Sequence, residues 1–249
     1  MTKTSETGHA VNVANLESLI STILSYGANY NPSRTSIQLD ALQMLLATAK
    51  ESFHAYYQAH SVYGKAVDDR ENAFKPLKVY ITRINNALKA SDSTSRNDES
   101  VQTIIRKLQG RRSSPKNTEK EKKLLESEGK VVHQISTSQM SYDMRIENLA
   151  TLISFLSKIP EYNPNEIDLK LETITEISNQ LKIKNSDVLN AYIHLGQARN
   201  KRNEILYHPL TGLVDICSDT KTYIKSVFGT SSPQYKQISK LKFKNQLKH

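Results

Sequence analysis

The feature that most constrains this chain is its similarity to itself. Residues 15–21 (NLESLIS) and 148–154 (NLATLIS) are identical at five of seven positions. A shift of 132 residues then aligns residues 30–74 with 162–206 without a gap, and about eight identities fall there, where chance pairing gives roughly three. The sequence therefore predicts a tandem duplication of one unit. The matched positions include Asn31, Pro32 and Arg70 in the first copy and Asn163, Pro164 and Arg202 in the second.

This repeat divides the 249 residues into three parts. Residues 1–110 are expected to form the first repeat unit, and residues 136–249 form the second unit with a basic C-terminal tail. Residues 111–135 are expected to form a basic connector. We expect the two units to pack on each other, and oligomers are compatible with the sequence.

The apolar residues of both copies recur with a helical period. In the first copy they alternate at spacings of three and four from Leu39 to Phe74, which predicts one long helix with a seam like that of a coiled coil. A similar stripe runs from Ile167 to Leu206. Residues 185–187 interrupt this stripe, so the second helix is expected either to continue or to kink or break there. Shorter helices are expected at 13–26, 77–89, 142–158 and 210–227. The fold class is thus all-α, an elongated helical bundle.

Two further local patterns affect this interpretation. Tyr-Asn-Pro occurs in both copies, where Asn31 or Asn163 would cap a helix that starts at the following proline. Tyrosines lie along the predicted seams, so we expect them to pack in the core rather than to stack on bases. These tyrosines are Tyr26, Tyr56, Tyr57, Tyr63 and Tyr192.

The net charge of +9 is concentrated in two segments. Residues 106–130 carry nine basic and four acidic residues, and residues 236–249 carry five lysines and no acid. The rest of the chain is close to neutral, which favours flexible basic arms over a basic folded face. The candidate anion-binding residues are Arg111, Arg112, Lys116, Lys236, Lys240, Lys242 and Lys244.

Several classes of protein are disfavoured by composition and pattern. A single cysteine, Cys217, excludes an internal disulfide framework and a cysteine-based zinc site. We also expect no membrane span, because the longest apolar run, residues 149–159, is interrupted by polar residues. Glu51 and His54 match one half of a di-iron motif, but the second copy lacks the other half. We therefore expect no metal, no cofactor and a cytoplasmic location.

An arginine occupies the same seam position in both copies, at Arg70 and Arg202. Such a residue is paired with an acid, or packs its aliphatic stem with the guanidinium at the surface, or binds an anion. The sequence favours a structural role and leaves the anion site as the alternative.

Residues 202–208 (RNEILYH) resemble the Arg, polar residue, His signature of the HEPN ribonuclease family. The resemblance covers seven residues and implies an all-helical enzyme that cuts RNA at a dimer interface. It implies that His208 acts as general acid or base and that Arg202, followed by Asn203, stabilises charge on the phosphate. The first copy departs from this signature, with Glu71 after Arg70 and Lys75 at the position matching Tyr207.

A second resemblance covers most of the chain. It rests on NLxxLIS, Tyr-Asn-Pro, residues 138–143 (SQMSYD), 212–216 (GLVDI), 225–229 (KSVFG) and 231–238 (SSPQYKQI). Together these segments resemble an uncharacterised duplicated helical family of Bacteroidetes-type bacteria. That resemblance implies a cytoplasmic bacterial protein and no known activity, cofactor or partner.

The sequence favours a non-enzymatic scaffold or interaction protein that holds an anionic partner, such as nucleic acid or a ribosome, through basic arms. One alternative is the HEPN-like ribonuclease with Arg202 and His208. The other is a purely structural helical bundle with a protein partner.

Overall fold

The computed structural model of the chain describes residues 6–111 and 140–247, with side chains described from residue 8 onward. Every regular element within these ranges is a helix, which confirms the all-α fold class. No helix in the described ranges is both long enough and apolar enough to cross a membrane.

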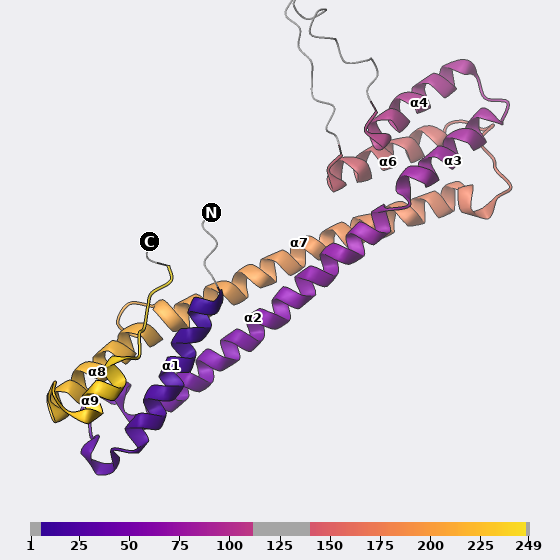
Figure 1. Cartoon of the computed structure of the whole chain (residues 1–249). Helices are drawn as coiled ribbons and strands as arrows, with labels where there is room; N and C mark the ends of the chain where they lie inside the picture. Colours follow the sequence, from indigo (N-terminus) through magenta and orange to yellow (C-terminus); the bar gives the residue numbers. More distant parts are fainter. Residues whose placement is uncertain (1–5, 112–139, 248–249) are drawn as a thin grey trace, which may run out of the picture. The chain divides into compact units, whose positions relative to one another are not determined.

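The elements follow one another in the same order in the two halves of the chain (Figure 1). The first half contains α1 (Glu6–Leu24), two short 3₁₀ helices η1 (Gly27–Asn29) and η2 (Thr35–Ile37), α2 (Leu39–Phe74), α3 (Leu77–Lys89) and α4 (Ser95–Gln109). The second half contains α6 (Tyr142–Leu156), η3 (Ile167–Leu169), α7 (Leu171–Tyr207), α8 (Leu213–Phe228) and α9 (Pro233–Ser239). This matching order supports the duplication, which stays an interpretation of the sequence.

The two long helices agree with the predicted seams. α2 spans Leu39–Phe74, as the spacing of its apolar residues predicts. α7 runs without a break through Asn185, the position at which the sequence left a kink open. The Asn185 side chain accepts a hydrogen bond from Arg70 Nη1 (3.1 Å) and donates one to Asp143 Oδ1 (2.7 Å). A polar residue in this helix is thus used for contacts between helices and does not interrupt the helix.

The predicted helix start at Tyr-Asn-Pro is wrong in both copies. Pro32 and Pro164 lie in irregular segments, and the helices begin only at Leu39 and Leu171. A tyrosine hydroxyl fixes each of these segments by donating to a backbone carbonyl seven residues later. Tyr30 bonds the carbonyl of Ile37, and Tyr162 bonds that of Leu169 at 2.8 Å. The repeated Tyr-Asn-Pro pattern therefore lies in a turn followed by a 3₁₀ helix that leads into the long helix.

The chain folds into two compact units that differ from the sequence repeats. Unit 1 comprises Met1–Tyr63 and Ala191–His249, and unit 2 comprises Gly64–Asn190. α2 and α7 each contribute residues to both units. Each unit therefore combines helices from both halves of the sequence.

Unit 1 has a core shared by α1, α8, α9 and the adjoining parts of α2 and α7 (Figure 1). α1 supplies Leu16, Leu19 and Ile23, all essentially inaccessible to solvent. α8 contributes Ile216, Cys217 and Ile224 from the facing side, and α9 contributes Ile238.

Unit 2 has a separate core. Its main contributors are the apolar faces of α3, α4 and α6, helped by parts of α2 and α7. α4 is capped by Thr94, whose hydroxyl accepts from the backbone N–H of Asn97, and it ends at Gly110 in the left-handed region. The buried residues include Ile81, Ile84, Leu88, Ile105, Leu108, Leu149, Leu152 and Leu156.

Candidate functional site

The C-terminal segment (residues 240–247) is held against α1 by two asparagine side chains. Asn12 Nδ2 donates to the carbonyl of Lys244 (2.8 Å), and Asn12 Oδ1 accepts from the backbone N–H of Lys244 (3.0 Å). Asn15 Nδ2 donates to the carbonyl of Lys242 (2.8 Å). The side-chain amide of Asn12 thus pairs with the segment as the backbone of a neighbouring strand would.

α8 holds the beginning of the same segment. Lys221 Nζ donates to the carbonyls of Leu241 (2.8 Å) and Ser239 (3.4 Å). Burial lowers the pKa of this ammonium group below its usual range, and the nearby Cys217 raises that pKa to a smaller extent. Lys221 therefore binds the backbone of the segment.

Alternate residues of the C-terminal segment face opposite ways. Leu241 and Phe243 pack against the core of unit 1, whereas Lys240, Lys242 and Lys244 are exposed. Lys240 has helical backbone angles at the end of α9, and Lys242 and Lys244 lie in the irregular segment after it, yet all three line the same groove. We call the exposed set, Lys240, Lys242 and Lys244, the lysine face.

The lysine face borders a groove of about 390 Å³ between the C-terminal segment and α1. Gly8, Val11, Asn12 and Asn15 line the α1 side of this groove, and Gln246 closes it next to Gly8. None of the residues from 220 to 249 is acidic. Among the described residues, no ion pair involves Lys240, Lys242 or Lys244.

The structure assigns different positions to the candidate anion-binding residues. Lys236 is exposed on α9, in the same unit as the lysine face. Arg111 is exposed just after α4, in unit 2. Arg112 and Lys116 lie outside the described residues. The expectation of a flexible tail is corrected for the C-terminal segment, because its backbone hydrogen bonds dock it on α1 and α8.

A buried polar cluster lies beneath this docking contact. His9 Nδ1 and the Tyr207 hydroxyl are 2.6 Å apart, and His9 Nε2 lies 3.4 Å from Arg202 Nη2. Asn12 Nδ2 also approaches the Tyr207 hydroxyl, at 3.4 Å. The cluster joins α1 to the last turns of α7. His9 and Asn12 gave no signal in the sequence, because a polar residue in an amphipathic helix predicts exposure unless its partner is known.

Arg202 is only 3% exposed and belongs to this cluster. Its guanidinium carbon lies 4.7 Å from the centre of the Tyr56 ring, and its Nη2 donates to Asn203 Oδ1 (2.9 Å). Arg70, its sequence counterpart, lies in unit 2, where its guanidinium stacks on Tyr142 at 4.0 Å. Both arginines thus stack on aromatic rings beside an asparagine.

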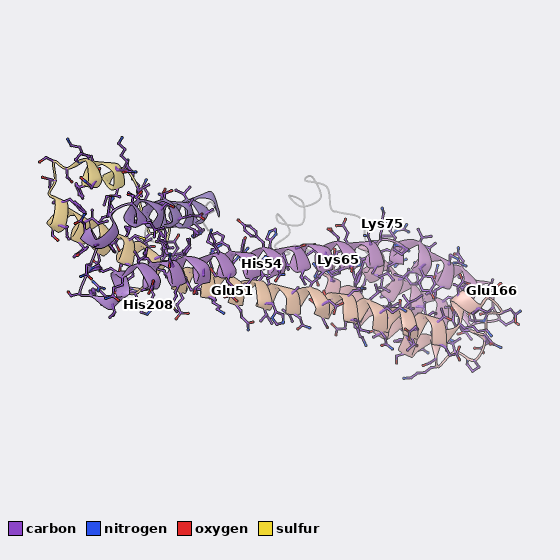
Figure 2. All side chains as sticks on the ribbon, turned by 90° about the horizontal axis from the view of Figure 1, so that it is seen from below. Glu51, His54, Lys65, Lys75, Glu166 and His208 are labelled. Atoms are coloured by element: carbon purple, nitrogen blue, oxygen red, sulfur yellow. The ribbon has the colours of Figure 1, made fainter. Side chains whose placement is uncertain are left out.

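His208 has a different environment from Arg202. It is exposed at the end of α7, and its Nδ1 contacts Thr211 Oγ1 (2.7 Å) and the carbonyl of Pro209 (2.9 Å) (Figure 2). Residues six apart on a helix do not share a face. The described chain therefore does not bring Arg202 and His208 together, and the ribonuclease alternative depends on a second copy.

Metal-binding clusters are absent from the described ranges, where no three His, Cys, Asp or Glu side chains converge. Glu51 and His54 lie on the exposed side of α2, one turn apart (Figure 2).

Two tyrosines that were expected in the core are half exposed. Tyr57 is 52% exposed and Tyr192 is 57% exposed, whereas Tyr26 and Tyr56 are buried as predicted. A seam pattern predicts burial only where another helix covers it.

Comparison with protein-family models, with curated proteins and with solved structures finds no match to this chain. The resemblance to a bacterial helical family and the resemblance to HEPN ribonucleases therefore stay predictions.

Proposed function

We propose that the protein is a non-enzymatic interaction protein that binds nucleic acid, ribosomal RNA included, through the lysine face of its docked C-terminal segment. A cytoplasmic location fits this role. The observation that carries the proposal is the arrangement of Lys240, Lys242 and Lys244 on the exposed side of a segment whose backbone is hydrogen-bonded to Asn12 and Asn15.

Pre-organisation gives this arrangement its value as an anion site. A free lysine-rich tail loses backbone entropy when it binds, whereas the docked segment has already lost that freedom on folding. The lysine ammonium groups meet phosphates as point charges and release counterions, so such binding depends strongly on salt and weakly on sequence. No acidic residue follows residue 219 to oppose it.

The test is a fluorescence anisotropy titration of labelled DNA and RNA with the full chain over a series of salt concentrations. The variant Lys240→Gln, Lys242→Gln, Lys244→Gln is compared with the natural protein. We expect the triple variant to lose affinity and the slope of log K against log salt to fall by about two to three.

A matched control removes the same charge from unit 2, by Lys75→Gln, Lys78→Gln and Lys89→Gln, all of which are exposed. Equal losses of affinity in the two triple variants would show that affinity depends only on net charge and not on the position of the lysines. That result would contradict the proposal. Absence of binding at low salt would contradict it outright.

The same samples test the ribonuclease alternative. Each RNA sample is run on a denaturing gel after the titration, for the natural protein and for His208→Ala. Cleavage that disappears in the variant would replace the binding proposal with an enzymatic one.

A further inference from the structure

We infer that unit 1 carries a second nucleic-acid surface, a set of tyrosine rings that stacks on unpaired bases and gives the protein a preference for single-stranded nucleic acid. The inference rests on the proposed function and specifies its ligand. We call this surface the aromatic platform, formed by the exposed Tyr57 and Tyr192 and by the rings that support them, Phe53, Tyr56 and Tyr63.

The first exposed ring, Tyr57, is fixed by its neighbours. Its centre lies 5.4 Å from that of Tyr56 and 6.1 Å from that of Phe53. Tyr56 is itself held by the guanidinium groups of Arg202 (4.7 Å) and Arg199 (6.0 Å). Tyr57 therefore presents about half of its surface to solvent from a packed position. A ring held in this way loses little side-chain entropy when a base stacks on it.

The second exposed ring is on α7. Tyr192 packs against Tyr63 of α2 with ring centres 5.9 Å apart. Tyr63 follows Tyr57 by six residues, which corresponds to about 9 Å along a helix axis. The two positions also lie about 120° apart around the helix, so Tyr57 and the Tyr63–Tyr192 pair form two separate stacking positions in unit 1.

The electrostatic surroundings favour an anionic ligand over a protein. Residues 52–63 of α2 and 191–203 of α7 contain no acid, and their charged side chains are Arg199, Lys201 and Arg202. Arg199 and Lys201 are exposed. Cations beside aromatic rings are the combination that binds single strands, because the cations contact phosphates and the rings contact bases. A duplex offers its phosphates to lysines but keeps its bases paired and stacked.

The platform and the lysine face are connected within unit 1 by the buried polar cluster. Asn12 holds the C-terminal segment and approaches the Tyr207 hydroxyl, which His9 also contacts. His9 then lies against Arg202, and Arg202 stacks on Tyr56. Side chains at the two surfaces are therefore linked by direct contacts, which places both surfaces on one body.

The absence of tryptophan from the chain allows a local test. The Tyr57→Trp variant carries a single tryptophan, whose emission is quenched when a base stacks on the indole. We expect an unlabelled deoxythymidine oligonucleotide of about 20 nucleotides, a length sufficient for an extended site, to quench the tryptophan emission. A duplex of the same length should change the emission little. Phe155→Trp, at an exposed position of α6 in unit 2, is the matched control and should not respond.

Affinity gives a second, independent readout. Tyr57→Ala with Tyr192→Ala should weaken single-strand binding by about ten-fold or more and leave duplex binding within about two-fold. Tyr57→Phe with Tyr192→Phe keeps the rings and should retain single-strand affinity. Helical circular dichroism of each variant confirms folding.

The outcomes separate this inference from the function on which it rests. Absence of any nucleic-acid binding by the natural protein would overturn both the proposed function and the aromatic platform. Equal affinity for single strands and duplexes, with no quenching of the Tyr57→Trp variant and no effect of the alanine pair, overturns the platform alone and leaves the lysine face as the binding surface.

Discussion

Tyr30 shows how one hydroxyl shapes the turn before a long helix. Its oxygen donates to the carbonyl of Ile37, and burial raises its pKa to about 12, with Tyr223 and Cys217 adding to the rise and a hydrogen bond with Thr220 opposing it. Tyr162 occupies the corresponding position before α7, and burial likewise raises its pKa. These phenols are folded into the protein in their neutral form.

The Tyr30→Phe variant should therefore lose about 1 kcal/mol of stability at neutral pH, because the Ile37 carbonyl loses its donor. In the unfolded chain a tyrosine ionises near pH 10, whereas in the folded protein Tyr30 keeps its proton up to about pH 12. The natural protein therefore loses stability at this site as the pH rises from 10 to 12, and the variant does not. Urea unfolding across this range should show the difference between the two proteins shrinking; a constant difference would contradict the assignment.

Leu210 is the one non-glycine residue of the described chain with a positive φ, at 68°, and its side chain is 74% exposed. The left-handed conformation of a leucine destabilises the folded state through steric contacts, and the exposed side chain of Leu210 contributes little burial to offset this. Leu210→Asn should raise the free energy of unfolding by about 0.5–1 kcal/mol, because asparagine tolerates this conformation. Ile167→Asn, at an equally exposed position with ordinary backbone geometry, should bring no such gain in urea unfolding.

At the scale of elements, the C-terminal segment depends on two side chains of α1. Replacing Asn12 and Asn15 by alanine removes both contacts to Lys244 and the contact to Lys242. Since each hydrogen bond contributes about 1 kcal/mol, the Lys244 amide should exchange hydrogen at least about ten-fold faster. Asn179→Ala, on an exposed face of α7 in unit 2, is the control. Unchanged exchange in the double variant would mean that Lys221, Leu241 and Phe243 hold the segment without the two asparagines.

The elements that the sequence predicted well are those with long apolar periods. α3 has the predicted bounds, and α2 covers its predicted seam from Leu39 to Phe74, although the start expected at Pro32 was wrong. The start of α8 was placed at Leu210 by analogy with Leu77, but α8 begins at Leu213. The positive φ of Leu210 and a close approach of Gly212 to the backbone of His208 create a turn there that has no counterpart before α3.

The candidate site was predicted in part. Lysines of the C-terminal segment were identified from charge alone, and their alternation with Leu241 and Phe243 was not part of that prediction. The docking on α1 was not predictable, because it joins residues more than 220 positions apart. The asparagines that make these contacts belong to no sequence motif that indicates their partners. Exposure of Tyr57 and Tyr192 depends in the same way on which helix covers a seam.

At the scale of the whole molecule, the compact units and the repeats are complementary divisions of the chain. Unit 1 combines α1 from the first half with α8 and α9 from the second. Unit 2 combines α6 from the second half with α3 and α4 from the first. Two copies of one unit that exchanged their third and fourth helices would give this composition.

This composition predicts how the chain behaves when it is cut between the repeats. A protease site inserted between residues 124 and 125 divides the sequence into halves, but both cores still require helices from each half. After cleavage the two pieces should co-elute in one gel-filtration peak, keep the helical signal and separate only in concentrated urea. Neither piece alone contains a complete core, so a piece expressed by itself should not unfold cooperatively as the natural protein does. Pieces that separate without denaturant, each with a cooperative unfolding transition, would show instead that the repeats are the folding units.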